Sequence, residues 1–107
     1  MPKKVTKQIV VSNMPPEDLL QPEAFALICK ALGHPARIKI VKHLREMDRC
    51  ICGQIVEILP LAQSTVSQHL KRLKQAGLIL GEVEGLNTCY CLDREMVEKF
   101  KKTVESL

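Results

Sequence analysis

An amphipathic stretch, residues 64–76, constrains the fold of this chain more than any other part of its sequence. Its apolar positions are spaced four and three residues apart, as on one face of an α-helix, and they are Val66, Leu70 and Leu73. Gly77 follows directly, and glycine best tolerates the left-handed conformation in which many helices end. The sequence therefore predicts a helix over 64–76 whose apolar side anchors it to a core.

A shorter helix is predicted immediately before this one. Its apolar stripe consists of Ile51, Ile55, Ile58 and Leu59. The helix must end before Pro60, because the residue preceding a proline is pushed out of the α region. Residues 61–63 then form a tight connection to the longer helix. A short helix, a tight corner and a longer helix together make a helix-turn-helix, whose second helix enters the major groove of DNA.

The outward side of the predicted helix over 64–76 is polar and basic. Its side chains are Ser64, Ser67, Gln68 and Lys71, with Arg72 and Lys74 close behind. Serine and glutamine near a helix N-terminus can bond base edges or phosphates, and basic side chains suit the phosphate backbone. By periodicity alone, an ordinary solvated helix fits this pattern equally well.

The remaining segments predict a mainly α fold with a small β-hairpin. Aromatic residues make up only 3% of a chain that is 46% hydrophobic, so the core must be aliphatic, which suits helix packing. Helices are predicted over 22–32 and over 36–45, the second with Ile38, Val41 and Leu44 on its apolar face. A last amphipathic helix is capped by Asp93 and has Val104 on its apolar face. The period changes to nearly two over 78–92, where the tetrad 84–87 can turn a hairpin. We expect residues 1–15 to form an arm and residues 16–107 to form one domain.

Length and charge limit the function. A domain of 107 residues leaves much apolar surface unburied, so a partner subunit would help. The net charge of +4 fits an anionic partner. The sequence has no apolar run of about 18 residues that could span a bilayer and no secretory signal, which predicts a cytoplasmic protein without a membrane partner. In that compartment the five cysteines are expected to be reduced thiols, acting either as small hydrophobes or as metal or redox ligands.

Cys50 and Cys52 are the candidate metal ligands. Cys50 falls where the helix predicted from Ile51 needs an N-cap, and its sulfur forgoes about 0.5 to 2 kcal/mol that an oxygen cap supplies. The positive helix end and neighbouring Arg49 both favour the thiolate, which binds soft ions. The other cysteines are predicted to fill space: Cys29 in the core, and Cys89 and Cys91 side by side under the hairpin.

A helix-turn-helix followed directly by a hairpin is the winged helix-turn-helix order, and from Glu23 onward the chain resembles the ArsR/SmtB family of bacterial repressors. The stretches that carry the resemblance are LGHPARIKIVKHL (32–44), CICGQIVEIL (50–59), AQSTVSQHLKRLKQAGLI (62–79) and TCYCL (88–92). The resemblance implies a homodimer, joined by its N- and C-terminal helices, that represses transcription from double-stranded operator DNA. It also implies that bases are read by Gln63, Ser64, Ser67 and Gln68, while His69 packs near the core or takes a backbone bond.

The resemblance extends to the inducer. The arsenite-responding branch places its ligands where this chain has Cys50 and Cys52, which implies release by a soft metal or metalloid ion, arsenite or antimonite, that folding does not require. The branch's third cysteine is replaced by Ile55, so Cys29, Cys89, Cys91 or an external thiol would have to complete a three-sulfur site. The wing carries Glu82 and Glu84 where the family commonly has basic residues. The family's zinc site in the last helix is not expected, because no histidine follows His69.

Three other functions compete with metal sensing. A thiol-oxidation or reactive-sulfur sensor would keep the DNA binding and join Cys50 or Cys52 to Cys29 or to a wing cysteine. A winged-helix protein that binds another protein would explain the acidic wing. A small thiol enzyme is disfavoured because the sequence has no Cys-x-x-Cys motif and no α/β pattern, so we expect no enzymatic activity.

Overall fold

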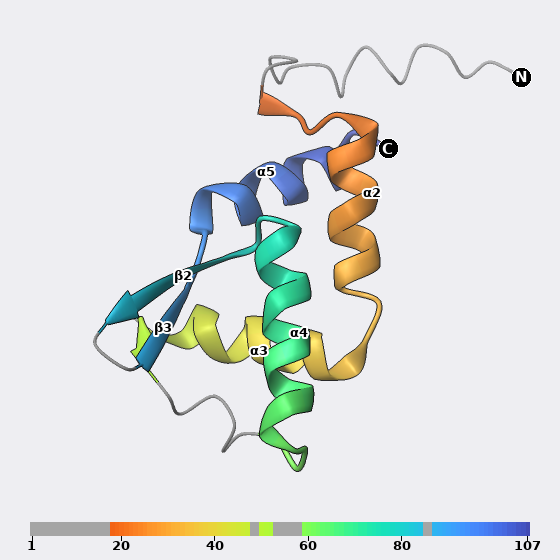
Figure 1. Cartoon of the computed structure of the whole chain (residues 1–107). Helices are drawn as coiled ribbons and strands as arrows, with labels where there is room; N and C mark the ends of the chain where they lie inside the picture. Colours follow the sequence, from red (N-terminus) through yellow and green to blue (C-terminus); the bar gives the residue numbers. More distant parts are fainter. Residues whose placement is uncertain (1–17, 48–49, 53–58, 85–86) are drawn as a thin grey trace, which may run out of the picture.

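The computed structural model describes residues 18–47, 50–52, 59–84 and 87–107. Within these ranges the helices are α2 (Pro22–Ala31), α3 (Pro35–Glu46), α4 (Gln63–Gln75) and α5 (Arg94–Glu105), and the strands are β1 (Ile51–Cys52), β2 (Ile79–Glu84) and β3 (Asn87–Leu92). Helix α2 packs against α4 and α5, and α3 packs against α4 and β3. Figure 1 shows the hairpin of β2 and β3 on the side of α4 away from α2. The predicted class, mainly α with a small β-hairpin, is confirmed.

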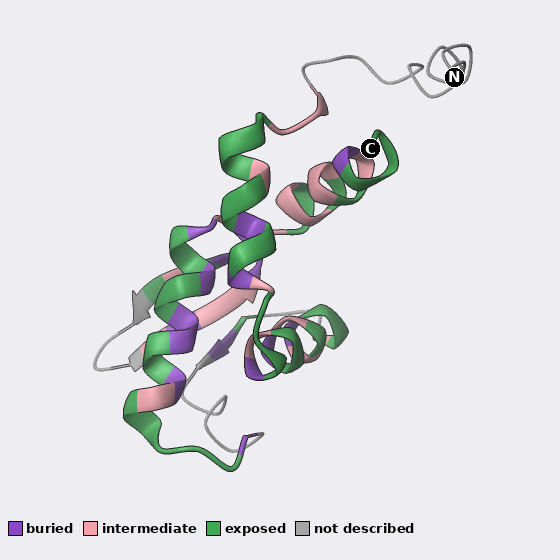
Figure 2. Ribbon diagram, turned by 90° about the vertical axis from the view of Figure 1, so that its right-hand side faces the viewer, coloured by how far each residue is buried: buried purple, intermediate pink, exposed green. Residues whose placement is uncertain are grey.

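The core is aliphatic, as the scarcity of aromatic residues predicts. Its most deeply buried side chains are Ile28, Ile40, Leu44, Val66, Leu73, Leu78 and Ile79. The three predicted anchors of α4 are all buried, and Figure 2 shows the buried positions of this helix on the side that faces the body. At the edge of this core, where Phe100 packs against it, the rings of Phe25 and Phe100 lie 5.3 Å apart between centroids and join α2 to α5.

Local capping explains where the helices begin and end. Helices α2 and α3 both begin at a proline, which loses no needed donor there. The Asp93 side chain accepts a hydrogen bond of 3.1 Å from the backbone N–H of Met96, as predicted for the last helix. Helix α4 ends at Gln75, and Gly77 just beyond it has a φ of 89°, in the left-handed region. The backbone N–H of Leu78 donates to the Leu73 carbonyl, so this end forms a Schellman motif.

The predicted helix over 51–59 is wrong at its start. Ile51 and Cys52 form β1, which pairs antiparallel with β3 and gives a sheet of order β1-β3-β2 in place of the predicted two-stranded ribbon. Ile51 is buried while Cys50 is exposed, so the pattern here has the period of a strand. Cys50 therefore does not occupy a helix N-cap. The rest of that predicted helix, 53–58, lies outside the described residues, as does the predicted arm, 1–15.

Three packing predictions also need correction. Cys29 is exposed, because Ile28 and Ala31 are the residues of α2 that face the core. Ile38 is 43% exposed, because α3 buries Ala36, Ile40 and Leu44 at a spacing of four. Val104 is 44% exposed, because α5 instead buries Thr103, whose hydroxyl accepts a hydrogen bond of 2.9 Å from the backbone N–H of Leu20.

Candidate DNA-binding surface and cysteine cluster

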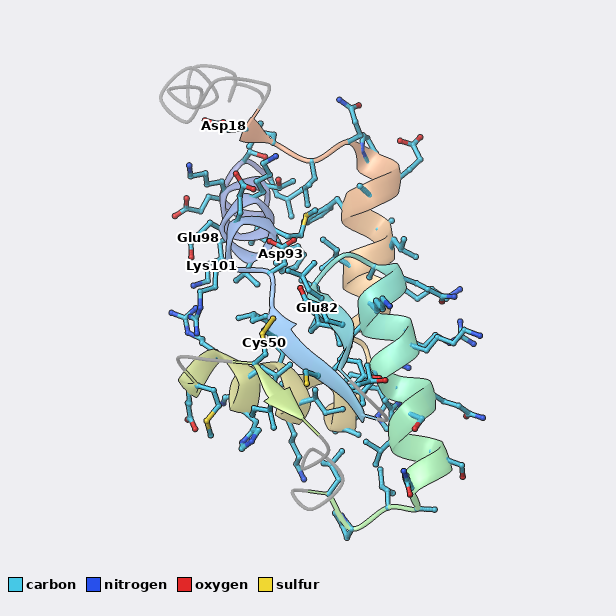
Figure 3. All side chains as sticks on the ribbon, turned by 60° about the vertical axis from the view of Figure 1, so that its left-hand side comes forward. Asp18, Cys50, Glu82, Asp93, Glu98 and Lys101 are labelled. Atoms are coloured by element: carbon cyan, nitrogen blue, oxygen red, sulfur yellow. A yellow bond between two sulfur atoms is a disulfide. The ribbon has the colours of Figure 1, made fainter. Side chains whose placement is uncertain are left out.

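The structure exposes the whole predicted DNA-contacting set on α4. Its members are Gln63, Ser64, Ser67, Gln68, Lys71 and Arg72. They share the side opposite the buried stripe, and Figure 3 shows nitrogen-tipped side chains extending from α4 away from the body. The helix thus offers short polar groups in its first two turns and cations in the turns that follow, all accessible to a ligand.

Two hollows carry the basic surface beyond α4. One is lined by Gln68, Lys71, Arg72 and Gln75. The other lies between α2 and α4 and is lined by Leu27, Lys30, Ala31, Arg37, Arg72 and Gln75. Arg72 belongs to both hollows, so the cations of α2 and α3 continue the surface of α4. Sequence reasoning missed Lys30 and Arg37, because their approach to α4 depends on how the helices pack.

His69 lies on the buried side of α4, in agreement with the prediction that it packs near the core. Its ring centroid lies 4.5 Å from that of His34, and its Nδ1 lies 3.4 Å from Arg37 Nη1. Burial lowers the pKa of His69, and the positive charge of neighbouring His34 and Arg37 lowers the pKa further. Because arginine can only donate, Nδ1 accepts, and the neutral ring carries its proton on Nε2. Arg37 is itself held by a 2.6 Å hydrogen bond from Nε to the Ala31 carbonyl.

The side chain of Lys74 extends over the hairpin, in a different direction from the side chains of Lys71 and Arg72. A Cβ placed on Gly81 would lie 3.4 Å from Lys74 Nζ and 3.3 Å from the Tyr90 ring. The absence of a side chain at Gly81 therefore leaves room for Lys74 over the hairpin. Glu82 is exposed on the same strand, so an acidic wing side chain faces solvent as the sequence indicates.

Four of the cysteines lie at one pair of strands. Cys50 and Cys91 form a disulfide with a Cα–Cα distance of 4.3 Å. Cys52 lies directly across from Cys89 in the ladder between β1 and β3, and Cys89, which is buried, is also disulfide-bonded. Figure 3 shows Cys50 beside β3.

These contacts overturn two predictions about the thiols. Cys50, Cys89 and Cys91 are not reduced, and neither wing cysteine is a mere filler. Cys29 on α2 is a free cysteine, as predicted. It is exposed, however, whereas the sequence predicted it to be in the core.

The donor chemistry of this cluster fits a soft ion only in the reduced state. Sulfurs joined in a disulfide are not thiolates and cannot serve as thiolate ligands. In agreement with this, no group of three or more His, Cys, Asp or Glu side chains among the described residues is arranged to hold a metal ion. The Cys52 side chain lies outside that description.

A recognition-type helix followed by a paired hairpin, with further helices on both flanks, defines a winged helix-turn-helix protein. A solved ArsR-like transcriptional regulator from Rhodococcus sp. RHA1 has this fold, with a TM-score of 0.67, 21% sequence identity and coverage of 78% of this chain and 77% of that chain. Residues 34–80 match the sequence profile of the family described as bacterial regulatory proteins of the arsR family.

Curated relatives agree with that match. The transcriptional repressor PagR of Bacillus anthracis is 34% identical over 82 residues, covering 77% of this chain and 82% of PagR. The repressor SmtB of Mycobacterium tuberculosis is 44% identical over 78 residues, which are 73% of this chain but only 56% of SmtB. The chain belongs to the arsR family. These relatives are transcriptional regulators, consistent with the non-enzymatic role predicted from the sequence. None of the described helices is long and apolar enough to cross a membrane.

Proposed function

We propose that this protein is a cytoplasmic transcriptional repressor that binds double-stranded operator DNA through the outward side of α4. The observation that carries the proposal is the division of this helix into two sides. Val66 and Leu73 are fully buried, while all six predicted DNA contacts are exposed. A helix anchored in this way can enter a major groove without losing its own packing.

Charge supports the same orientation. Lys71 and Arg72 follow the polar residues of α4, and Lys30 and Arg37 extend the positive surface toward α2. Each neutralised phosphate releases counterions, so such contacts strengthen binding to any DNA sequence. Glu82 on the wing repels phosphate, which assigns the wing a small share of the affinity.

The repressor would act as a homodimer joined through α2 and α5. Leu27 on α2 is 47% exposed and Val104 on α5 is 44% exposed, so both terminal helices offer apolar surface to a second copy. Two copies would present two α4 helices to the two halves of an inverted repeat.

The experiment that tests DNA binding is a fluorescence-anisotropy titration of a labelled duplex from the chain's own upstream region. Arg72→Ala should weaken binding and reduce the slope of log affinity against log salt by about 1. Lys101→Ala is the matched control, because it removes the same charge from α5, where Lys101 pairs with Glu98 at 3.5 Å. Equal losses from the two variants would exclude α4 as the contact surface.

The inducer would be a soft metal or metalloid ion, arsenite or antimonite, held by Cys50 and Cys52 in the reduced protein. Thiolates are the preferred ligands of such ions. Because β1 precedes Leu59 and α4 along the chain, an ion that rearranges β1 would disturb the support of α4. A coupling of about 1 to 3 kcal/mol would suffice to release the operator.

Thiol oxidation is a second candidate signal, and the Cys50–Cys91 disulfide favours it. Hydrogen peroxide would take two electrons and two protons from the two thiols, giving the disulfide and two molecules of water. Titrating the reduced protein on operator DNA with arsenite, and separately with peroxide, distinguishes the candidates. Release by peroxide alone would reject the metal version.

A further inference from the structure

We propose that Cys89 and Cys91 of β3 complete the ion site of Cys50 and Cys52, so that four thiolates from two adjacent strands hold one thiophilic divalent cation within a single subunit. The proposal rests on the ion-sensing role given above to Cys50 and Cys52. It adds the ligands that the replacement of the arsenite branch's third cysteine by Ile55 leaves unassigned. It also places the wing inside the sensor, because β3 is the second strand of the hairpin.

The first argument is the contact between Cys50 and Cys91. Their disulfide and the Cα–Cα distance of 4.3 Å bring the two sulfurs to one point between the strands, although 41 residues separate them in sequence. Sulfurs that can bond to each other need only a small side-chain rotation to bond to one ion between them. In the reduced protein this pair therefore offers two thiolates at one place.

The second argument is the register of β1 against β3. Cys52 lies directly across from Cys89, one residue pair beyond Ile51 and Tyr90. Opposite residues of an antiparallel pair have Cβ atoms about 4.5 to 5.5 Å apart, and residues two apart on a strand lie about 7 Å apart. Sulfurs bound at about 2.3 Å to one tetrahedral ion lie roughly 4 Å from each other. The four cysteine positions on the two strands thus form a rectangle that is larger than the spacing of sulfurs around one ion. Cysteine side chains that turn toward the centre of this rectangle can bring the sulfurs to the shorter spacing.

The third argument is the graded exposure of the sulfur-bearing residues. Cys50 is exposed, Cys91 is half-buried and Cys89 is only 4% exposed. An ion could therefore enter from the side of Cys50, while Cys89 would bind it from the protein side. Partial burial also weakens competition from water for the bound ion.

Formation of the site requires reduction first. Each disulfide takes two electrons from a thiol or phosphine reductant and two protons to become two thiols, so both the Cys50–Cys91 disulfide and the disulfide that holds Cys89 must be reduced before four thiols are present. Each thiol that then binds the cation loses its proton to solvent, so the binding is coupled to proton release. The bound ion would tie β1 to the wing strand in a geometry that differs from the disulfide-linked one.

Cadmium titration of the full-length reduced protein tests the proposal, with binding followed by the ultraviolet charge-transfer absorbance of cadmium thiolates. We expect one Cd²⁺ per subunit. Cys89→Ser and Cys91→Ser should each lower the absorbance at saturation by about a quarter, since one of four sulfurs is lost. Each should also weaken binding at least tenfold, because even changes outside the ligand shell cost about 10- to 100-fold. Cys29→Ser is the matched control and should leave both values unchanged.

The variants separate this proposal from the one on which it rests. If Cys50→Ser and Cys52→Ser abolish binding but Cys89→Ser and Cys91→Ser bind as the unaltered protein does, the wing ligands are rejected and the site of Cys50 and Cys52 alone stands. If the unaltered reduced protein binds arsenite but no Cd²⁺, the four-thiolate site is rejected and the site of Cys50 and Cys52 stands; if it binds neither ion, both proposals fail. Far-ultraviolet circular dichroism and the DNA affinity of each metal-free variant show that it is folded, and Cys89→Ala replaces Cys89→Ser if the buried serine prevents folding.

Discussion

The outward side of α4 and the cysteine cluster of β1 and β3 are built in opposite ways. The α4 surface comes from one continuous segment, and its polar residues reach solvent because their neighbours on the same helix are buried. The cluster exists only because two strands pair, and the two cysteines of its disulfide are 41 residues apart in sequence. A local surface and a non-local cluster can be altered independently. DNA affinity should therefore follow α4, and the response to a signal should follow the strand pair.

The largest effect is expected where α4 meets the core. Leu73 has no exposed surface, so Leu73→Ala should lower the free energy of unfolding by about 2 to 5 kcal/mol, through lost burial and a residual cavity. Urea denaturation measures this loss. Gln75→Ala, at an exposed position of the same helix, should change it by less than about 0.5 kcal/mol. Similar values for the two variants would contradict the two-sided description of α4.

Reduction of the cysteine cluster at β1 and β3 should lower the free energy of unfolding by a somewhat smaller amount. Cleaving the disulfides at β1 and β3 should cost about 2 to 4 kcal/mol of unfolding free energy, because the unfolded chain regains the freedom of a long loop. The measurement compares urea denaturation with and without a phosphine reductant. The Cys50→Ser, Cys91→Ser double variant should lose much of the difference. If the reductant has the same effect on that variant as on the unaltered protein, the cross-strand disulfide does not contribute to stability.

The junction between the regions is sensitive to a single methyl group. Gly77, between α4 and β2, has a φ of 89°, which costs a residue with a side chain about 1 to 2 kcal/mol. We expect Gly77→Ala to lower the unfolding free energy by that amount. Gly33→Ala gives a comparison, because that glycine has no left-handed φ, although its Cβ would lie 3.3 Å from the Lys30 carbonyl. Thermal denaturation of both variants measures the difference between their stability losses. A Gly77→Ala variant as stable as the unaltered protein would contradict the prediction.

The smallest effect is a pH dependence that comes from His69, on the buried side of α4. Because the pKa of His69 is lowered in the folded state, the unfolded state binds more protons near the ordinary pKa of 6.5. The unfolding free energy should therefore fall as the pH drops below about 6.5, and the loss should be complete below the lowered pKa. His69→Gln should flatten this part of the pH profile. Identical profiles for the variant and the unaltered protein would show that His69 is not the responsible group.

The same contrast explains what the sequence could predict. Helix α4, its anchors, its glycine end and the Asp93 cap follow from local spacing, because the determinants lie within a few residues of each other. Strand β1 was missed because Ile51 also fits a helical stripe with the apolar residues that follow it. Only the pairing with Tyr90 and Cys89 decides in favour of a strand, and that partner lies far along the chain. Cys29 was misplaced for a related reason, since the neighbours of α2 determine which of its apolar residues are buried.

The account depends most on the exposed side of α4 reading DNA bases. The direct measurement is the ratio of affinities for the chain's own upstream duplex and for a scrambled duplex of the same length, at one salt concentration. Because a side chain that reads a base contributes about 1 to 3 kcal/mol of discrimination, Ser67→Ala with Gln68→Ala should lower this ratio about tenfold or more. Affinity for the scrambled duplex should be nearly unchanged. A ratio equal to that of the unaltered protein, in a folded double variant, would contradict the account.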